Sequence, residues 1–251
     1  MKKEFLIIIP VYNEKEALRD VTISTIKESQ DFADILFVND GSTDGSAEVI
    51  NQLQDDFPDL KAIHKIKNEG YGASLISGFK YGEYFGYNYL ITMDCDNQHQ
   101  PKDLRKFKNF DRNVDLVSGS RYLKESKAQG IKAPKDRVEI NQRITCLLNS
   151  SYNWNLTDSF CGYKRYKTSS FKDANFTETG YASPLELWSY AYSKNLNIKE
   201  IPVDKIYVNE DRSFGIDLDK KRRRYKYYLK TWKESHKKYS GVFFKKSPCT
   251  A

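Results

Sequence analysis

Short apolar runs alternate with segments of helical periodicity along the first 120 residues of the chain. A continuous apolar run, as at residues 5–12, suits a strand buried on both faces, whereas Ala17, Leu18 and Val21 are spaced like one face of a helix. The predicted strands are residues 5–12, 35–38, 60–66, 89–93 and 114–118, and the predicted helices are residues 14–29, 43–53 and 71–85. Strands separated by helices of this length need crossover connections, so we expect an α/β domain with a mostly parallel sheet flanked by helices.

The pattern becomes less regular after residue 121. Residues 122–135 are polar and contain Gly130 and Pro134, which predicts a mobile loop. Further helices are expected over 137–151 and 184–194, a turn and strand over 158–166, and an edge strand containing Pro202 over 198–208. We therefore expect a domain over residues 1–216, with halves at 1–121 and 122–216, and a separate C-terminal segment over 217–251.

Polar or glycine-containing segments follow five of the predicted strands. They are residues 10–14 (PVYNE), 39–45 (NDGSTDG), 68–72 (NEGYG), 94–98 (DCDNQ) and 118–121 (SGSR). The carboxyl ends of parallel strands lie at one edge of a sheet, which is where such sheets bind ligands. Ordinary turns would be distributed over both edges, so this arrangement predicts a ligand site.

The fourth of these segments carries the carboxylates of Asp94 and Asp96, followed by the amide of Gln98. Side chains two residues apart in an extended chain point the same way, so both carboxylates can face one site. Carboxylate and amide oxygens suit a hard divalent cation that also binds substrate phosphates. Taken alone, the pair is more typical of a solvated turn, and a capping residue before Pro101 is the alternative interpretation of Gln98.

Composition places the chain among globular proteins. It has 251 residues, is 39% hydrophobic, and contains no apolar run close to the roughly 18 residues of a membrane span. Its start lacks the apolar region of a signal peptide, and its four cysteines show no C-x-x-C pairing. These features favour a cytoplasmic protein.

The net charge of +7 is concentrated near the C-terminus. Residues 218–246 contain twelve Lys or Arg and two acids, a net charge of +10, which leaves −3 for the remainder. A helix over 220–239 would place aromatic and aliphatic side chains on one face: Tyr225, Tyr228, Leu229, Trp232 and Tyr239. A basic, amphipathic helix of this kind is typical of an anionic membrane surface, and the alternative is a helix that docks its aromatic face on the domain. Nucleic acid is not expected, because it would leave the strand-end segments unexplained.

As a set, the first four strand-end segments, together with Ile9 and His99 at their ends, resemble family 2 glycosyltransferases of the GT-A (Rossmann-like) fold. Later segments are similar to the dolichyl- or polyprenyl-phosphate sugar transferases, of which dolichol-phosphate mannosyltransferase is the best known: 119–122 (GSRY), 158–163 (DSFCGY), 201–203 (IPV) and 211–215 (DRSFG). The resemblance covers residues 4–216. Two departures are Asn39, where the family usually has an acid, and 216–217 (ID), where many members have Ser-Lys.

The resemblance implies an inverting, metal-dependent hexosyltransferase that moves a sugar from GDP-mannose or a UDP-hexose to a polyprenyl or dolichyl phosphate. Such an enzyme would act peripherally at the cytoplasmic membrane face, with a membrane-anchor subunit as a potential partner. Mg²⁺ or Mn²⁺ is expected to bind Asp96 and Gln98, with Asp94 binding the metal or the ribose.

The nucleotide-sugar is expected to contact Pro10, Tyr12, Glu14, Asp40, Asn68, Gly70 and Asp94. Asp40 would accept hydrogen bonds from the base or ribose. Tyr12 is equally compatible with core packing. For Thr43 and Asp44, capping of the next helix is the preferred interpretation. Arg121 and Arg212 are expected to bind phosphate, one of the donor and one of the acceptor, because a forked guanidinium matches phosphate oxygens.

A hydroxyl acceptor would need a general base to remove its proton. Many family 2 enzymes provide it from an acidic pair before a helix, but residues 180–186 (GYASPLE) contain no such pair. A lipid phosphate is already anionic at neutral pH, so the missing pair favours a phosphate acceptor. If the acceptor is a glycan hydroxyl in envelope polysaccharide synthesis, Asp158 is the candidate base. A non-catalytic nucleotide-sugar-binding protein is a third hypothesis, which the presence of Asp40, Asp94 and Asp96 argues against.

Overall fold

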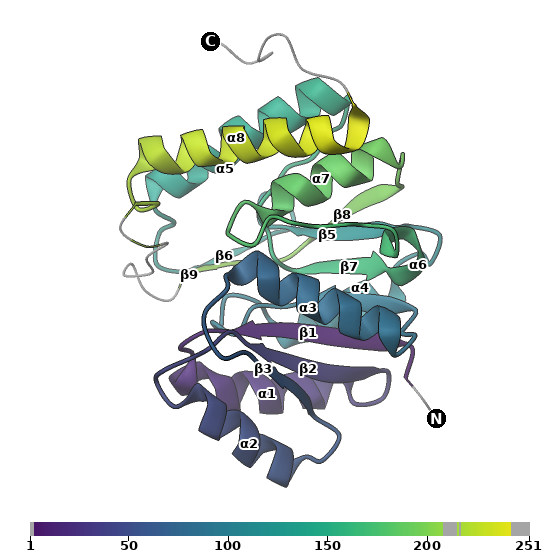
Figure 1. Ribbon diagram of the computed structural model, residues 1–251, viewed down its shortest axis with the longest axis vertical. Coiled ribbons are helices and arrows are strands. Elements are labelled where there is room, and N and C mark those ends of the chain that lie inside the picture. Colours follow the sequence, from purple (N-terminus) through teal and green to yellow (C-terminus); the bar gives the residue numbers. More distant parts are fainter. Residues whose placement is uncertain (1–2, 208–214, 216, 242–251) are drawn as a thin grey trace.

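A mixed seven-stranded sheet forms the centre of the protein in a computed structural model that describes residues 3–207, 215 and 217–241 (Figure 1). Its strand order is β3-β2-β1-β4-β7-β5-β8. The strands are β1 (Phe5–Val11), β2 (Ala33–Asn39), β3 (Lys61–His64), β4 (Tyr89–Thr92), β5 (Leu116–Ser120), β7 (Lys164–Lys167) and β8 (Ile198–Pro202). All pairs are parallel except those of β7, which runs antiparallel to both β4 and β5. The expected mostly parallel α/β sheet is confirmed.

Helices cover both faces of this sheet. They are α1 (Lys15–Ser29), α2 (Ser46–Asp56), α3 (Tyr71–Tyr84), α4 (Leu104–Asn109, after the 3-10 turn Pro101–Asp103), α5 (Lys135–Tyr152), α6 (Thr168–Phe171), α7 (Ser183–Ser193) and α8 (Lys221–Ser240). Strand β1 explains the two layers, because Ile7 and Ile9 join the core under α1, α2 and α4, whereas Leu6 and Ile8 join the core under α3, α5, α7 and α8. A strand buried on both faces has no polar alternation, which is why its sequence is one apolar run.

Two segments of the second half differ from the sequence prediction. The expected loop over 122–135 contains a short strand, β6 (Ala128–Gly130), and the expected single strand over 198–208 is divided into β8 and β9 (Lys205–Tyr207). Strand β8 lies at the edge of the main sheet beside β5, whereas β9 pairs with β6 in a separate two-stranded sheet. The residues of β6 are all exposed, so this strand has no hydrophobic pattern for the sequence to show.

The C-terminal helix α8 packs across α5 and α7 at one end of the molecule (Figure 1). Trp232 is fully buried and its indole N–H donates to the Tyr152 hydroxyl at 3.0 Å, while the Tyr228 ring lies 4.7 Å from that of Phe160. The expectation that the aromatic face lies in a membrane interface is therefore wrong, and the docked alternative is correct. The reason is that α5 and α7 leave an apolar surface that only this face can cover.

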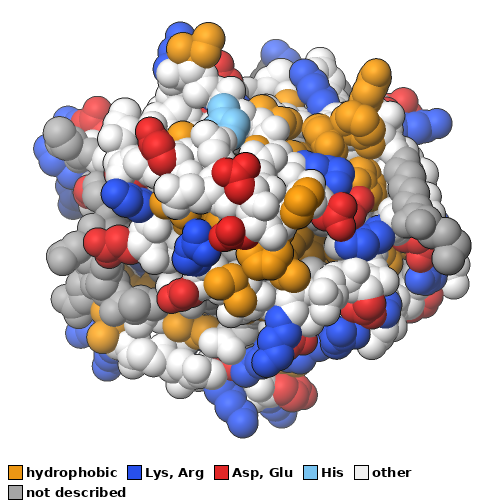
Figure 2. Space-filling view, turned by 90° about the horizontal axis from the view of Figure 1, so that it is seen from below, with side chains coloured by type: hydrophobic (Ala, Val, Ile, Leu, Met, Phe, Trp, Pro, Cys, Tyr) orange, Lys and Arg blue, Asp and Glu red, His pale blue; other side chains and the backbone are white. Residues whose placement is uncertain are grey.

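The lysines and arginines of α8 mostly point outward, away from this contact. At the opposite end of the molecule, acidic and basic side chains are interspersed (Figure 2). No described helix has a stretch apolar and long enough to cross a bilayer.

Arg165 on β7 is a fully buried cation that fastens the connection between α4 and β5 to the sheet. Its guanidinium donates to the carbonyl oxygens of Phe107, Phe110, Asp111 and Val114 at 3.1, 2.9, 2.7 and 3.1 Å. One side chain therefore supplies donors to four peptide carbonyls, of which those of Phe107 and Asp111 also accept a backbone N–H.

Replacing this guanidinium with an apolar side chain is expected to destabilise the fold. Arg165→Leu removes four hydrogen bonds to buried carbonyls and should lower the free energy of unfolding by roughly 3 kcal/mol, measured by urea denaturation. The matched control is Arg105→Leu, which removes an exposed ion pair with Asp31 and should change stability by less than about 1 kcal/mol. Equal effects of the two substitutions would contradict this role of Arg165.

Candidate functional site

A cleft of about 740 Å³ opens at the carboxyl ends of the parallel strands. All but two of the site residues predicted from the sequence line this cleft. The predicted residues that line it are Pro10, Tyr12, Glu14, Asp40, Asn68, Gly70, Asp94, Asp96, Gln98 and Arg121. Of the other two, Asp158 lies behind the cleft wall and Arg212 lies outside the described residues. The strand-end segments thus meet at one site, and the part that each side chain plays toward a ligand stays a prediction.

Asp40, at the end of β2, is a buried carboxylate that holds the loop before α3. Its oxygens accept hydrogen bonds from the backbone N–H groups of Glu69 at 3.1 Å and Gly70 at 2.8 Å, and the Lys65 ammonium lies 2.9 Å away. Only 3% of Asp40 is exposed. It therefore shapes the first turn of α3, in addition to facing the cleft where a base or ribose was predicted.

The loops after β1 and β2 are joined by side-chain hydrogen bonds. Asn13 accepts from the Thr43 N–H at 2.8 Å, and Asp44 accepts from the N–H groups of Lys15 at 3.0 Å and Ser46 at 2.9 Å. Asp44 therefore caps both α1 and α2, and α2 begins three residues later than predicted because Asp44 precedes its first turn. Burial opposes the charge of Asp44, but hydrogen bonds from Ser46 and Lys15 outweigh it and lower the pKa of that carboxyl.

Tyr12 is 46% exposed at the cleft, so the alternative of core packing does not hold for it. An exposed aromatic ring beside a polar cleft offers a flat surface to a ligand. Its role in binding nucleotide remains a prediction.

Asp94 is oriented by two neighbours. The Tyr71 hydroxyl donates to its Oδ1 at 3.0 Å, and its backbone N–H donates to His99 Nδ1 at 2.9 Å. Burial and the nearby Asp94 charge raise the pKa of Tyr71, so this hydroxyl remains a donor. Burial lowers the pKa of His99, whose ring stacks on Tyr163 with centroids 4.8 Å apart. A neutral imidazole thus accepts the backbone hydrogen bond.

Gly162 supports the same carboxylate from the other side. Its carbonyl accepts a hydrogen bond from the Thr92 hydroxyl at 2.5 Å, which holds the Gly162 backbone next to the end of β4. A Cβ at this position would lie 2.9 Å from Asp94 Oδ2 and 2.8 Å from the Tyr71 hydroxyl oxygen. Only a glycine leaves Asp94 in its present place.

Asp96 and Gln98 are brought together by a tight turn. Asn97 has a left-handed backbone with φ of 61°, which asparagine tolerates well, and the Gln98 N–H donates to Asp96 Oδ1 at 2.9 Å. Together with Asp94, these side chains offer carboxylate and amide oxygens to the same cleft. No three His, Cys, Asp or Glu side chains in the described ranges are close enough to hold a metal by themselves. This donor set fits Mg²⁺ or Mn²⁺, which complete their coordination with phosphate oxygens and water.

The cleft is also lined by three arginines. Arg121 follows β5, Arg137 comes from α5 and Arg224 from α8, and all three line the cleft. Arg224 is 2% exposed, pairs with Asp136 and donates to the Leu218 carbonyl at 2.9 Å. Sequence reasoning missed Arg137 and Arg224, since neither lies in a recognisable motif and Arg224 is surrounded by other basic residues.

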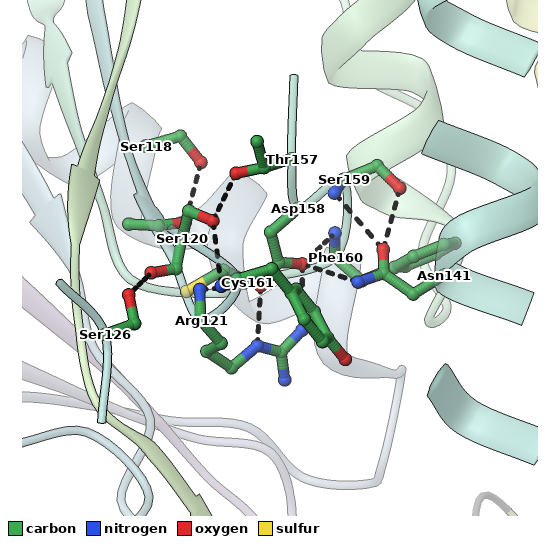
Figure 3. Close-up of polar contacts among 12 residues, drawn as sticks. Ser118, Ser120, Arg121, Ser126, Asn141, Thr157, Asp158, Ser159, Phe160 and Cys161 are labelled. Carbon is green, nitrogen blue, oxygen red and sulfur yellow. Dashed lines mark hydrogen bonds and ion pairs between the residues drawn. The ribbon is translucent and has the colours of Figure 1, made fainter. Parts of the chain in front are cut away.

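The direction of Arg121 is fixed by Asp158 (Figure 3). Arg121 Nε lies 2.7 Å from Asp158 Oδ2 and Nη2 lies 3.0 Å from Oδ1, while Asn141 and the Phe160 N–H donate to Oδ1 at 3.0 and 3.1 Å. Asp158 is fully buried; burial opposes its charge, but Arg121 outweighs this and lowers the pKa of Asp158. A carboxylate enclosed in this way anchors Arg121, and its geometry does not suit the predicted alternative of a general base.

The contact between Gly162 and Asp94 leads to a test of the metal site. Gly162→Ala should displace the Asp94 carboxylate and weaken Mn²⁺-dependent binding of GDP or UDP by roughly tenfold, measured by calorimetry. Asp94→Asn is the reference for loss of that charge without added bulk. Binding by Gly162→Ala at the wild-type level, with an unchanged melting temperature, would contradict the proposed support.

Comparisons with known proteins agree with this geometry. The undecaprenyl-phosphate mannosyltransferase of Micrococcus luteus is 30% identical over 201 residues, which are 79% of this chain and 82% of that protein. The UDP-N-acetylglucosamine–dolichyl-phosphate N-acetylglucosaminyltransferase of Methanococcus voltae is 25% identical, over 86% of this chain and 91% of that protein.

A solved structure of similar fold is glucosyl-3-phosphoglycerate synthase from Mycobacterium tuberculosis, in complex with Mn²⁺, UDP and glucosyl-3-phosphoglycerate. It has a TM-score of 0.67 at 12% identity and covers 97% of this chain and 82% of that chain. The family model described as glycosyl transferase family 2 matches residues 6–174, which contain all five strand-end segments. The chain therefore belongs to glycosyl transferase family 2.

Proposed function

We propose that this protein transfers a hexose from a GDP- or UDP-sugar to a polyprenyl phosphate, with inversion at the anomeric carbon. The observation that carries the proposal is that one cleft collects two sets of side chains of opposite character, here called its acidic and basic poles. The acidic set lies in the first, second and fourth strand-end segments, whereas the arginines come from the fifth segment (Arg121), from α5 (Arg137) and from α8 (Arg224). The two relatives described above are named for transfer to lipid phosphates, which supports this choice of acceptor.

The acidic pole suits the donor diphosphate. Asp94, Asp96 and Gln98 would hold Mg²⁺ or Mn²⁺, which as a Lewis acid offsets the charge that develops on the leaving diphosphate. Asp40 and the first turn of α3 would face the nucleoside. The Mn²⁺ in the structure of glucosyl-3-phosphoglycerate synthase supports a divalent ion in this fold.

The basic pole suits an anionic acceptor. Forked guanidinium groups match phosphate oxygens, and the ion pair with Asp158 holds Arg121 ready for such a contact. The carboxylates that line the described part of the cleft are Glu14, Asp40, Asp94 and Asp96, all from the first half of the chain. A phosphate nucleophile needs no base, which is consistent with a second half that contributes arginines.

We further propose that the outer face of α8 binds the anionic cytoplasmic surface of a membrane. Five exposed cations are spaced three or four residues apart along this face: Arg222, Lys226, Lys230, Lys233 and Lys237. Residues with this spacing form one stripe along a helix, on the side away from the buried Trp232. The attraction would be electrostatic, since the aromatic face is buried. A membrane-anchor subunit is the alternative partner of this surface.

A donor and acceptor panel tests the proposed reaction. Purified protein with Mn²⁺ and a short polyprenyl phosphate should release nucleoside diphosphate from one of GDP-mannose, UDP-glucose or UDP-N-acetylglucosamine, and release should depend on the lipid. Asp96→Ala should lower this rate by roughly 100-fold, because the leaving diphosphate loses its metal. Release that is independent of the lipid phosphate, or that occurs only with a glycan hydroxyl, would refute the proposed acceptor.

Membrane binding should depend on the charge of the α8 stripe. Replacing Lys226, Lys230, Lys233 and Lys237 with Gln should reduce sedimentation with phosphatidylglycerol vesicles by two orders of magnitude or more, at about 1 kcal/mol for each lysine. The matched control replaces four exposed lysines elsewhere: Lys80, Lys172, Lys194 and Lys199. Equal loss in both variants, or binding to uncharged phosphatidylcholine vesicles, would contradict the assignment.

A further inference from the structure

The segment over residues 177–182 leads into α7 and contacts both the cleft and the C-terminal helix. Gly180 and Tyr181 line the cleft, whereas the Glu178 side chain lines a neighbouring groove. Family members that transfer a sugar to a hydroxyl acceptor were expected to carry an acidic pair close to this place. The segment therefore contains one carboxylate close to the site whose function the reaction does not explain.

The Glu178 carboxylate is bound by its own loop and by α8. Oε1 accepts from the Gly180 N–H at 2.8 Å and from the Tyr227 hydroxyl, and Oε2 accepts from the Thr231 hydroxyl at 3.3 Å. Burial and the Glu178 charge raise the pKa of Tyr227, so its hydroxyl remains a donor. The same hydroxyl oxygen accepts from the Ala182 N–H at 3.4 Å. Tyr227 thus contacts both ends of the segment.

A second carboxylate, Glu186 on α7, fastens the start of the segment. It accepts from the N–H groups of Thr177 at 2.8 Å and Glu178 at 2.7 Å, and from Lys238 on α8 at 2.7 Å. Burial opposes the charge of Glu186, but Lys238 and the two N–H groups outweigh it and lower the pKa of this carboxyl. Two carboxylates therefore connect α8 to the segment.

The segment in turn supports the first turn of α3. The Ala73 N–H donates to the Thr179 carbonyl at 3.1 Å, and a Cβ at Gly70 or Gly72 would clash with the backbone of residues 178–179. The Tyr181 ring stacks on that of Tyr71, with centroids 6.1 Å apart and planes 16° apart. Tyr71 is the residue whose hydroxyl holds Asp94, so the contacts are continuous from α8 to the acidic pole.

We propose that Glu178 is a positioning residue for the donor site, and that Tyr227 and Thr231 make α8 part of this device. The carboxylate fixes residues 177–182 to α8. Through the Thr179 carbonyl and the Tyr181 ring, the segment then holds Tyr71 where it orients Asp94 and Gly70 where it binds Asp40. The inference rests on the proposed function only in assuming that the cleft binds a nucleoside diphosphate with a metal. It does not depend on the identity of the acceptor.

The test compares Glu178→Gln and Tyr227→Phe with the wild-type chain. Both substitutions nearly keep the shape of the side chain. Tyr227→Phe removes the donor of the hydrogen bond between α8 and the segment, and Glu178→Gln removes the negative charge and one of the two acceptor oxygens. Calorimetry should show roughly tenfold weaker binding of GDP or UDP in the presence of Mn²⁺, and the donor KM should rise by a similar factor. The matched control is Tyr225→Phe, which removes a hydroxyl from the same helix on a ring that packs against Arg143, and should bind like the wild type.

The outcomes separate positioning from stability. A merely structural role would lower the melting temperature and the active fraction but leave the nucleotide affinity and the Mn²⁺ requirement of the folded protein unchanged, and that result would overturn the proposal. If Glu178→Gln fails to fold, Tyr227→Phe decides, since its ring packing is retained. Weakened binding in the variants, with no lipid-dependent transfer by the wild type, would support the positioning role while refuting the proposed acceptor.

Discussion

The ion pair between Arg121 and the buried Asp158 is the interaction on which the acceptor half of the structure depends. The Asp158 carboxylate accepts hydrogen bonds from Arg121 at the end of β5, from Asn141 on α5 and from the Phe160 N–H. The Asp158 N–H in turn donates to Glu200 on β8 at 3.0 Å. A buried carboxylate is costly to desolvate, so removing Arg121 would leave the charge of Asp158 uncompensated. Because these partners come from separate elements, the charge that orients Arg121 also fixes the relative positions of β5, β8 and α5. The basic side of the cleft is consequently rigid before any ligand binds.

Much of the fold follows from local patterns, and the exceptions have identifiable causes. The buried parallel strands and their helices were predictable because continuous apolar runs and helical spacing can be recognised in the sequence without knowing the order of the strands in the sheet. The position of β7 between β4 and β5 was not, since its sequence, residues 164–167 (KRYK), reads as surface. Arg165 is buried there because four carbonyls satisfy its guanidinium, and such compensation arises only when distant segments meet. Strand β6 escaped prediction because exposed strands need no hydrophobic alternation.

The candidate site shows the same division. The strand-end segments were recognisable because parallel topology brings them to one edge, and all of the predicted residues in the first half line the cleft. Arg224 lies on the buried face of α8 with Tyr228 and Trp232, but its role was not recognisable, because Arg222 and Arg223 have the same chemistry and its partner Asp136 is distant in sequence. Glu178 was missed for a related reason, since its partners lie about 50 residues away on a helix whose aromatic face looked suited to a membrane.

The proposed reaction brings together two phosphate-bearing substrates, and their mutual repulsion sets the requirement that the cleft must meet. A single basic pocket would bind both anions but would not distinguish donor from acceptor. Carboxylates at Asp94 and Asp96 repel a bare phosphate and favour one that arrives with a divalent cation, whereas Arg121 and Arg137 favour an uncomplexed anion. In the proposed reaction, the two sets of side chains would therefore sort the substrates before the chemistry begins. It also explains why one helix can serve both poles: α8 contributes Arg224 to the basic side and, through Tyr227 and Glu178, supports the acidic side.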